Sequence, residues 1–324
     1  MSETVPGPDQ TDEPANDTAA PDQEQPGAPA CGCGHVHSED ELHLYQHAIP
    51  AGTEAIEVLT DLAARRLTNA TTTGIPFGFQ DLDLLTNGIQ AGQLVVIGSY
   101  SGVGKSTLAR DIARSCAVRE GLPAVIYSYE QTERELVDCI LAAEADIPLH
   151  RIRTATVAEE ESQRLTAAAG SLTQAPLFID ATTAVMESVI ERTEALKRRF
   201  DIKLAVIDSW GLAVSPAEAA LYGPLIKNMA VELSMAVVVV AQCRRPSRPV
   251  PLPPTVHDLR DDGHLADAAD LVLMLHRDDA HTPVKGPRAG ITEVTVTGRA
   301  APPATISLRN ELHYGRHRDL RLSA

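Results

Sequence analysis

The sequence predicts an α/β domain with a mostly parallel central sheet and helices on both faces. Short apolar runs recur along the chain, helix-like segments separate them, and a glycine-containing loop joins the first run to the first helix. Near-continuous apolar strands that alternate with helices are typical of a parallel sheet buried on both faces. We expect strands at 94–98, 124–129, 176–180, 204–208, 236–241 and 271–275, followed by a hairpin at 291–296 and 304–308.

The helix expected after the first strand carries an apolar stripe at helical spacing and ends near Gly121. Thr132, followed three residues later by Glu135, predicts a capping box at the start of the next helix. The apolar stripe of the first helix consists of Leu108, Ile112, Ala113, Cys116 and Ala117.

The first fifty residues differ from the rest of the chain in charge. They contain ten Asp or Glu and no Lys or Arg, so they carry −10 of the net −16 and leave −6 for the remainder. Few aliphatic side chains and many prolines predict disorder there. We expect four parts: an acidic Pro-rich tail at 1–50, a linker helix at 51–72, the α/β domain at 73–318 and a short tail at 319–324.

The chain shows no sign of export or membrane insertion. The N-terminus has neither the basic and apolar regions of a signal peptide nor the arginines of a transit peptide, and no apolar run is long enough to span a membrane. The five cysteines are an odd number, which indicates a reduced compartment. We expect a cytoplasmic protein without membrane contact.

The segment SYSGVGKST at 99–107 predicts a phosphate-binding loop, because it lies between a strand and a helix. Backbone N–H groups would hold the β-phosphate, Lys105 would reach the β and γ oxygens, and Ser106 would bind Mg²⁺. Glycines provide backbone freedom where the phosphates come closest, although Ser99 occupies the place of the first consensus glycine. With ATP and Mg²⁺ as expected cofactors, the predicted binding residues are Ser99, Gly102, Val103, Gly104, Lys105, Ser106, Thr107 and Asp208.

Three polar residues at expected strand ends are candidates for the chemistry. Asp208 would orient Mg²⁺, which makes it a metal ligand together with Ser106, and Glu130 would align or deprotonate the attacking water. Gln242 follows a third strand, where an amide would sense the γ-phosphate. The alternative for the two acids is an ordinary turn or helix-capping role.

Several segments resemble the ATPase domain of DnaB-type replicative hexameric helicases. The resemblance extends from about Thr73 to Leu308, and its most specific part runs from Asp258 to Gly263 and continues into Asp-Ala-Ala-Asp. It implies a RecA-like P-loop fold and an oligomeric, hexameric ring that hydrolyses ATP and acts on single-stranded DNA. The segments are TGIPFGFQDLDLLTNGIQAGQLVVIG, SGVGKS, YSYE, VIDSWGL, VVVVAQCRR and HDLRDDGHLADAADLVLMLHRD.

The resemblance also implies roles for single residues. Lys105 and Ser106 would form Walker A, Asp208 Walker B, Glu130 the catalytic glutamate and Gln242 the γ-phosphate sensor. The helix at 54–67 would be the linker helix that packs on the neighbouring subunit. In the family a lysine and an arginine reach into the neighbour's active site. Here Arg299 stands at the arginine and Thr297 at the lysine, so we expect Arg299 to act alone.

Three departures from the family pattern support a second hypothesis. The N-terminal domain that contacts primase is replaced by the acidic tail, so we expect no primase contact through it. Thr297 replaces the lysine, and the segment after Walker B, in which the family has a DNA-facing loop, is short and contains Lys227 as its only basic residue. A non-translocating ATPase that acts as a nucleotide-switched regulatory or scaffold protein is therefore the alternative to a helicase.

One basic cluster is a candidate for contact with single-stranded DNA. Arg244, Arg245 and Arg248 follow Gln242, where a loop that couples ATP to DNA would emerge. The alternative is a solvated Arg/Pro loop. Trp210 follows Walker B and is expected in the core rather than stacked on a base.

Thiol and imidazole side chains gather in the acidic tail, where they would suit zinc or another soft metal. Their spacing is not that of a folded zinc module, which favours a disordered spacer over a metal site. The candidate ligands are Cys31, Cys33, His35 and His37, with His43 and His47 further along.

Overall fold

The computed structural model describes residues 55–56, 72–182, 185–215, 217–244, 252–259, 263–280 and 288–320. The acidic tail with its Cys/His cluster lies outside the described residues, and so does the predicted linker helix except for 55–56, which are helical. The chain divides into two units, Met1–Leu67 and Thr68–Ala324, and all elements below belong to the second. Among the described helices, none is long and apolar enough to span a membrane.

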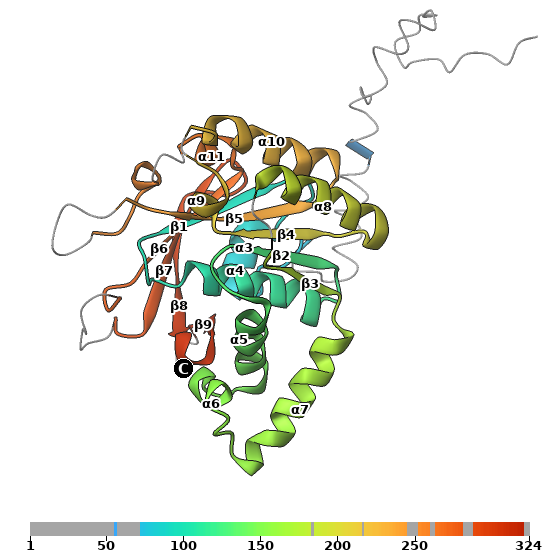
Figure 1. Ribbon diagram of the computed structural model, residues 1–324. Coiled ribbons are helices and arrows are strands. Elements are labelled where there is room, and N and C mark those ends of the chain that lie inside the picture. The colour runs from blue at the N-terminus through green and yellow to red at the C-terminus, as the bar shows by residue number, and fades with distance from the viewer. Residues whose placement is uncertain are drawn as a thin grey trace, which may run out of the picture. The chain divides into compact units, whose positions relative to one another are not determined.

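A single sheet forms the centre of the second unit, and its nine described strands lie in the order β3-β2-β4-β5-β1-β6-β7-β8-β9 (Figure 1). Neighbours from β3 to β6 are parallel, whereas the pairs from β6 to β9 are antiparallel. This arrangement confirms the predicted mostly parallel α/β fold. The strands are β1 (Leu94–Ser99), β2 (Ala124–Ser128), β3 (Leu177–Asp180), β4 (Leu204–Asp208), β5 (Ala236–Gln242), β6 (Leu271–His276), β7 (Ile291–Gly298), β8 (Ala304–Glu311) and β9 (Arg316–Asp319).

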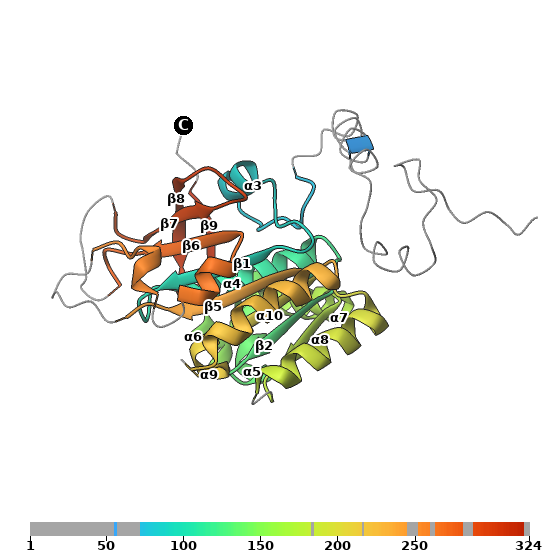
Figure 2. The same ribbon diagram turned by 90° about the horizontal axis from the view of Figure 1, so that it is seen from above.

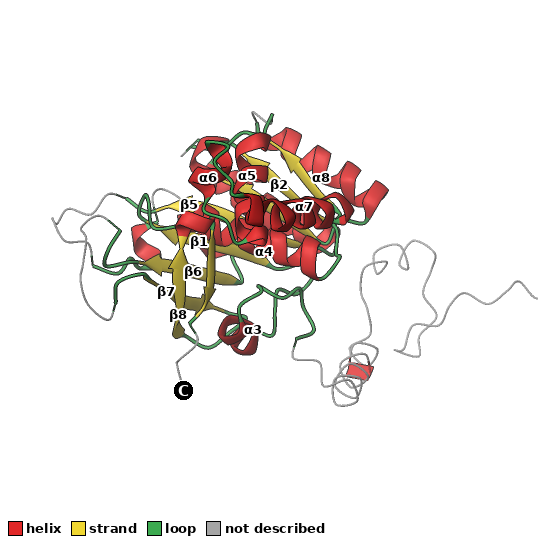
Figure 3. Ribbon diagram, turned by 90° about the horizontal axis from the view of Figure 1, so that it is seen from below, coloured by secondary structure: helices red, strands yellow, loops and turns green. Residues whose placement is uncertain are grey.

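Helices cover both faces of the sheet, as the sequence predicts. α8 and α10 lie on one face, and α4, α5 and α7 lie on the other (Figures 2 and 3). The predicted capping box is present, since Thr132 accepts the Glu135 N–H and Glu135 accepts the Thr132 N–H. The helices are α3 (Gln80–Thr86), α4 (Lys105–Arg114), η1 (Ser115–Arg119), α5 (Glu133–Ala145), α6 (Leu149–Arg153), α7 (Glu159–Gln174), α8 (Met186–Phe200), α9 (Trp210–Ala213), α10 (Ala219–Glu232), η2 (Val256–Asp258), α11 (Gly263–Ala268) and η3 (Leu312–Tyr314).

The core lies between the central strands and the apolar faces of the helices. Every residue of β1, β2, β4 and β6 is buried, which explains why these strands read as continuous apolar runs. The predicted stripe of α4 and η1 is buried against them, and Trp210 is completely buried, as expected. Each fully buried Val, Leu or Ile side chain contributes about 1.5–3 kcal/mol, so the stripe holds α4 firmly on the sheet.

The parallel strands end at two opposite edges. The carboxyl edge contains Ser99, Ser128, Asp208 and Gln242, because the register pairs Ser99 with Gln242 and Ser128 with Asp208. The amino edge contains the first residues of the same strands and Leu271 of β6, which pairs with Val95. Side chains that follow β1, β2, β4 and β5 therefore converge at the carboxyl edge.

The strand β9 was not predicted. Its four residues are Arg-His-Arg-Asp, which carry none of the apolar pattern by which the other strands were found. β9 pairs with β8 and packs against α4, and the His317 N–H donates to Asp111 of α4 at 2.7 Å. The β8–β9 hairpin therefore rests on the helix that begins at the phosphate-binding loop.

Candidate nucleotide-binding site

The loop between β1 and α4 requires glycine at two positions. Gly102 has φ +78° and Gly104 has φ +118°, both in the left-handed region that side-chain-bearing residues rarely adopt. A Cβ atom at Gly104 would also lie 3.0 Å from Cε1 of His317. Ser99 is the last residue of β1 and is fully buried, and its hydroxyl donates to the Tyr100 carbonyl at 2.8 Å. Ser99 is thus a strand residue that precedes the loop.

Lys105 begins α4 and is nearly buried beside the loop. Its amine donates to the Tyr100 carbonyl at 3.2 Å, and burial lowers the pKa of the amine against the opposing charges of Asp208 and Glu130. Within the described part of the chain the amine forms no ion pair. A buried ammonium group with one carbonyl partner is suited to bind an anion.

Ser106 and Asp208 lie together at the carboxyl edge. The Ser106 hydroxyl donates to Oδ1 of Asp208 at 3.1 Å. Burial raises the pKa of Asp208 to about 6, with a further increase from the charge of Glu130 and an opposing effect of the Ser106 hydrogen bond. A hydroxyl and a carboxylate in contact, at a site that disfavours an uncompensated negative charge, fit the oxygen ligands that Mg²⁺ prefers.

Glu130 lies two residues beyond β2, at the same edge as Asp208, and is exposed. Its Oε1 accepts a hydrogen bond from the Ser209 hydroxyl at 3.1 Å, which orients the carboxylate next to Asp208. Ser209 was not anticipated as a positioning residue. Its place immediately after Asp208 is the signal that could have identified it.

Gln242 ends β5 opposite Ser99 and has an exposed side chain, so the register brings the predicted sensor to the site. Arg110, which sequence reasoning missed, is buried on α4. Its guanidinium donates to Gln131 at 3.2 Å and to the Gly315 carbonyl at 3.3 Å, and its charge lowers the pKa of Asp208. The signal in the sequence that could have identified Arg110 is its position within a helix that was expected to be buried.

Arg299 lies at the amino edge, away from the phosphate-binding loop. The register pairs Gly298 with Leu271, and the Arg299 guanidinium donates to Asp270 at 3.2 Å. The six residues of β6 span about 20 Å between the two edges. Arg299 is therefore not brought together with Lys105 and Glu130 of its own chain. Its neighbour Thr297 is bonded within the sheet, to the Val272 carbonyl at 3.5 Å.

The predicted DNA-contacting arginines and the lysine of the segment after Asp208 are placed as follows. Arg245 and Arg248 lie outside the described residues, whereas the backbone N–H of Arg244 donates to the Asp258 carbonyl at 2.8 Å. This bond places the Asp258 segment next to the end of β5. Lys227 belongs to α10, and its amine donates to the Gly92 carbonyl at 2.7 Å and to Asp270 at 2.6 Å.

The mostly parallel sheet and the loop that precedes α4 define a P-loop nucleotide-binding domain. Residues 74–319 match the family model described as DnaB-like helicase C terminal domain, and the chain belongs to this family. It is 32% identical to the replicative DNA helicase DnaB of Leifsonia xyli subsp. xyli (strain CTCB07), over 83% of this chain and 61% of that protein. It is 28% identical to the replicative DNA helicase DnaC of Bacillus subtilis (strain 168), over 84% of this chain and 64% of that protein.

Solved structures agree with the fold. A solved ATPase domain superposes with a TM-score of 0.75 at 24% identity, over 82% of this chain and 98% of that one. A DnaB-like replicative helicase, solved in a study of its interactions with primase, superposes with a TM-score of 0.70 at 24% identity, over 82% of this chain and 66% of that one. The chain spans about six tenths of the length of the two curated relatives. The predicted DnaB-type membership and RecA-like fold are confirmed.

Proposed function

We propose that this chain is a Mg²⁺-dependent ATPase that works as an oligomeric, hexameric ring on single-stranded DNA, with ATP bound between subunits. The observation that carries the proposal is the convergence of Lys105, the Ser106–Asp208 pair and the Ser209–Glu130 pair at one edge of the sheet. Family membership adds the expectation that the energy of hydrolysis drives movement on DNA.

Each residue of the site has a role that follows from its contacts. The loop N–H groups and Lys105 would hold the phosphates, because the amine has one carbonyl partner and a buried position. Ser106 and Asp208 would hold Mg²⁺, which when bound neutralises charge on the β and γ oxygens. Glu130, held by Ser209 and open to solvent, would align the attacking water and accept its proton. Gln242 would sense the γ-phosphate.

The place of Arg299 supports assembly. An arginine about one strand length from its own phosphate-binding loop does not reach a nucleotide bound there. In a ring it would instead stabilise charge on the γ-phosphoryl group of a nucleotide on another subunit. In a ring, the amino edge of one subunit would then face the nucleotide of the next. ATP turnover should depend on assembly for this reason.

A second candidate function is a nucleotide-switched regulator that does not translocate. It is favoured by the Lys227–Asp270 ion pair, because the only basic residue of the segment after Walker B is held within the fold. Thr297, in place of the family's lysine, is likewise bonded to its own sheet. Both observations reduce the charge available for DNA.

ATPase rate with and without single-stranded DNA, measured from low to high salt, distinguishes the two candidates. A translocating motor should be stimulated by DNA, and the stimulation should fall with salt because phosphate contacts release counterions. Replacing Arg244, Arg245 and Arg248 together by Ala should weaken DNA binding and flatten its salt dependence while basal ATPase persists. A protein that neither binds DNA at low salt nor responds to it would support the regulator.

A further inference from the structure

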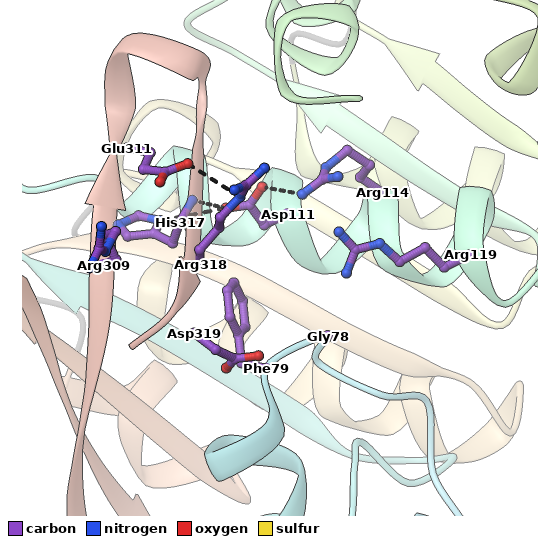
Figure 4. Close-up of a pocket in the computed structure, with 10 residues that line it drawn as sticks. All are labelled: Gly78, Phe79, Asp111, Arg114, Arg119, Arg309, Glu311, His317, Arg318 and Asp319. Atoms are coloured by element: carbon purple, nitrogen blue, oxygen red, sulfur yellow. Dashed lines mark hydrogen bonds and ion pairs between the residues drawn. The ribbon is translucent and has the colours of Figure 1, made fainter. Parts of the chain in front are cut away.

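A cavity of about 510 Å³ lies beside α4, and His317 separates it from Gly104 of the phosphate-binding loop. It is lined by α4 and η1, by the β8–β9 hairpin and by the residues before α3 (Figure 4). Four arginines line it, Arg114, Arg119, Arg309 and Arg318, and we call it the arginine pocket. Three carboxylates, Asp111, Glu311 and Asp319, line it as well.

Two of the four arginines are neutralised by carboxylates. Arg114 forms ion pairs with Asp111 at 3.0 Å and with Glu144. Arg318 lies 3.3 Å from Asp146 and 3.3 Å from Glu311. These two side chains complete an ion-pair network that joins α4 and α5 to the β8–β9 hairpin, and they have no need of a ligand.

The other two arginines are exposed and have no such partner in the described part of the chain. Neither Arg119, at the end of η1, nor Arg309, in β8, forms a side-chain hydrogen bond or ion pair with any described residue. Figure 4 shows them on opposite sides of the cavity. Two guanidinium forks that face one space from different elements can bind the oxygens of one anion.

A buried imidazole forms the wall of the pocket on the side of the phosphate-binding loop. The side chain of His317 is 0% exposed, and it lines the pocket. Its Nδ1 lies 3.5 Å from Asp111, and its Cε1 and Nε2 face Gly104 of that loop. Both ring nitrogens are inaccessible, so an anion in the pocket would contact the arginines and not this ring.

We propose that the arginine pocket binds a small anion with at least two phosphate groups, such as pyrophosphate or the phosphate end of a nucleotide. Its volume lies within the range of small-molecule sites and exceeds what one phosphate group needs. The nearest lining residue of α4, Asp111, is six residues beyond Lys105, which is about 9 Å along the helix. Binding in the pocket therefore does not require Lys105.

Calorimetry on the full chain with inorganic pyrophosphate, without Mg²⁺, tests the proposal. The Lys105→Ala background removes binding at the phosphate-binding loop, and loss of ATP-analogue binding is verified separately. We expect one pyrophosphate to bind this variant, and Arg119→Ala with Arg309→Ala to weaken the binding at least tenfold, because each lost contact is charge-assisted. Arg198→Ala with Arg199→Ala on α8 is the matched control, since it removes two arginines outside the pocket and should leave the affinity unchanged.

Thermal unfolding verifies that the arginine variants fold, as expected for exposed side chains without partners among the described residues. Pyrophosphate binding that is absent in Lys105→Ala, or that is unchanged by the Arg119 and Arg309 substitutions, overturns the proposal.

Further titrations identify the source of the phosphate. ADP that binds Lys105→Ala more tightly than pyrophosphate, and depends equally on Arg119 and Arg309, assigns the pocket to a nucleotide. Equal affinities assign it to the phosphates alone. A DNA oligonucleotide that displaces pyrophosphate would make the pocket part of a nucleic-acid surface and would overturn the assignment to a small anion.

Discussion

Each edge of the parallel strands holds a largely buried aspartate, Asp208 or Asp270, and the two differ in whether a cation neutralises them. At the carboxyl edge, Asp208 forms no ion pair with a described residue, and burial raises its pKa to about 6. At the amino edge, Asp270 accepts the Leu94 N–H at 2.8 Å and pairs with Lys227 and Arg299 at 2.6 and 3.2 Å. A carboxylate without a cationic partner can bind a metal ion, whereas a carboxylate that is paired with a lysine and an arginine stabilises the sheet.

Arg299 is the exception at the amino edge. Its side chain is 70% exposed, so its ion pair with Asp270 contributes little stability and is easily broken. Lys227 is 23% exposed and remains tied to the sheet. The comparison therefore predicts that residues of the carboxyl edge determine activity and that residues of the amino edge determine stability. Arg299 is the residue of the amino edge that we expect to affect activity.

Arg299→Ala tests the link and should have the largest effect on turnover. ATP binding should persist, whereas hydrolysis should fall by about 10³ to 10⁵, because a cation from the neighbouring subunit stabilises charge on the γ-phosphoryl group. Steady-state ATPase and binding of an ATP analogue measure the two effects. The stability of the fold should hardly change.

Mixed oligomers decide whether Arg299 acts on the neighbour. Arg299→Ala subunits retain a sound phosphate-binding loop, and Lys105→Ala subunits retain a sound arginine. Mixing them should recover activity that neither variant has alone. Co-assembly without recovery would contradict action between subunits, and full activity of Arg299→Ala would reduce the residue to a surface arginine.

Glu130→Gln tests the carboxyl edge itself. Glutamine keeps an oxygen that can accept the Ser209 hydrogen bond but cannot take a proton, so hydrolysis should fall by about 10² to 10⁴ while ATP binding is preserved. Calorimetry with an ATP analogue and single-turnover hydrolysis separate binding from chemistry. If binding is lost together with hydrolysis, Glu130 is a structural residue.

The raised pKa of Asp208 predicts a specific pH dependence of stability in the metal-free protein. Between its ordinary value of 3.8 and about 6, the folded state binds more protons at this carboxyl than the unfolded state does. The free energy of unfolding should therefore fall as the pH rises through this window, by up to about 3 kcal/mol. Urea unfolding at pH 4 to 7 measures it.

Asp208→Asn is the control for the pH experiment. It cannot ionise, so the variant should lack this decrease and should be more stable than the parent at pH 7. Asp83, whose pKa is also raised to about 6 by burial, stays in both proteins, and the difference between them isolates Asp208. Equal slopes in the two proteins would show that Asp208 has an ordinary pKa.

The sequence predicted what depends on local pattern. Strands appear as apolar runs, and the Gly-Lys-Ser ending correctly placed a glycine-dependent loop between β1 and α4. The placement of Asp208, Glu130 and Gln242 at one edge followed from strand ends alone, since parallel strands bring their carboxyl ends together. Parallel register made these long-range neighbours predictable.

What depends on pairing between distant side chains could not be predicted. β9 carries no apolar alternation, so nothing in its four residues indicated that His317 would lie against Gly104. The partner of Lys227 lies 43 residues away, and that of Arg299 29 residues away. Neither helical spacing nor strand alternation relates residues that lie so far apart in the sequence. Only the order of the strands in the sheet brings them together.

Lys227→Met should have the smallest effect on activity and gives the sharpest test of the amino edge. Methionine preserves the aliphatic stem but leaves the Gly92 carbonyl and one Asp270 oxygen without the amine, at a cost of about 1–3 kcal/mol in the free energy of unfolding. ATPase per folded molecule, with and without DNA, should change less than twofold. Urea unfolding of Lys227→Met, Asp270→Asn and the double variant gives the coupling energy of the pair. Unchanged stability together with loss of DNA stimulation would instead place Lys227 on the DNA path, and the amino edge would then have a function beyond holding the sheet.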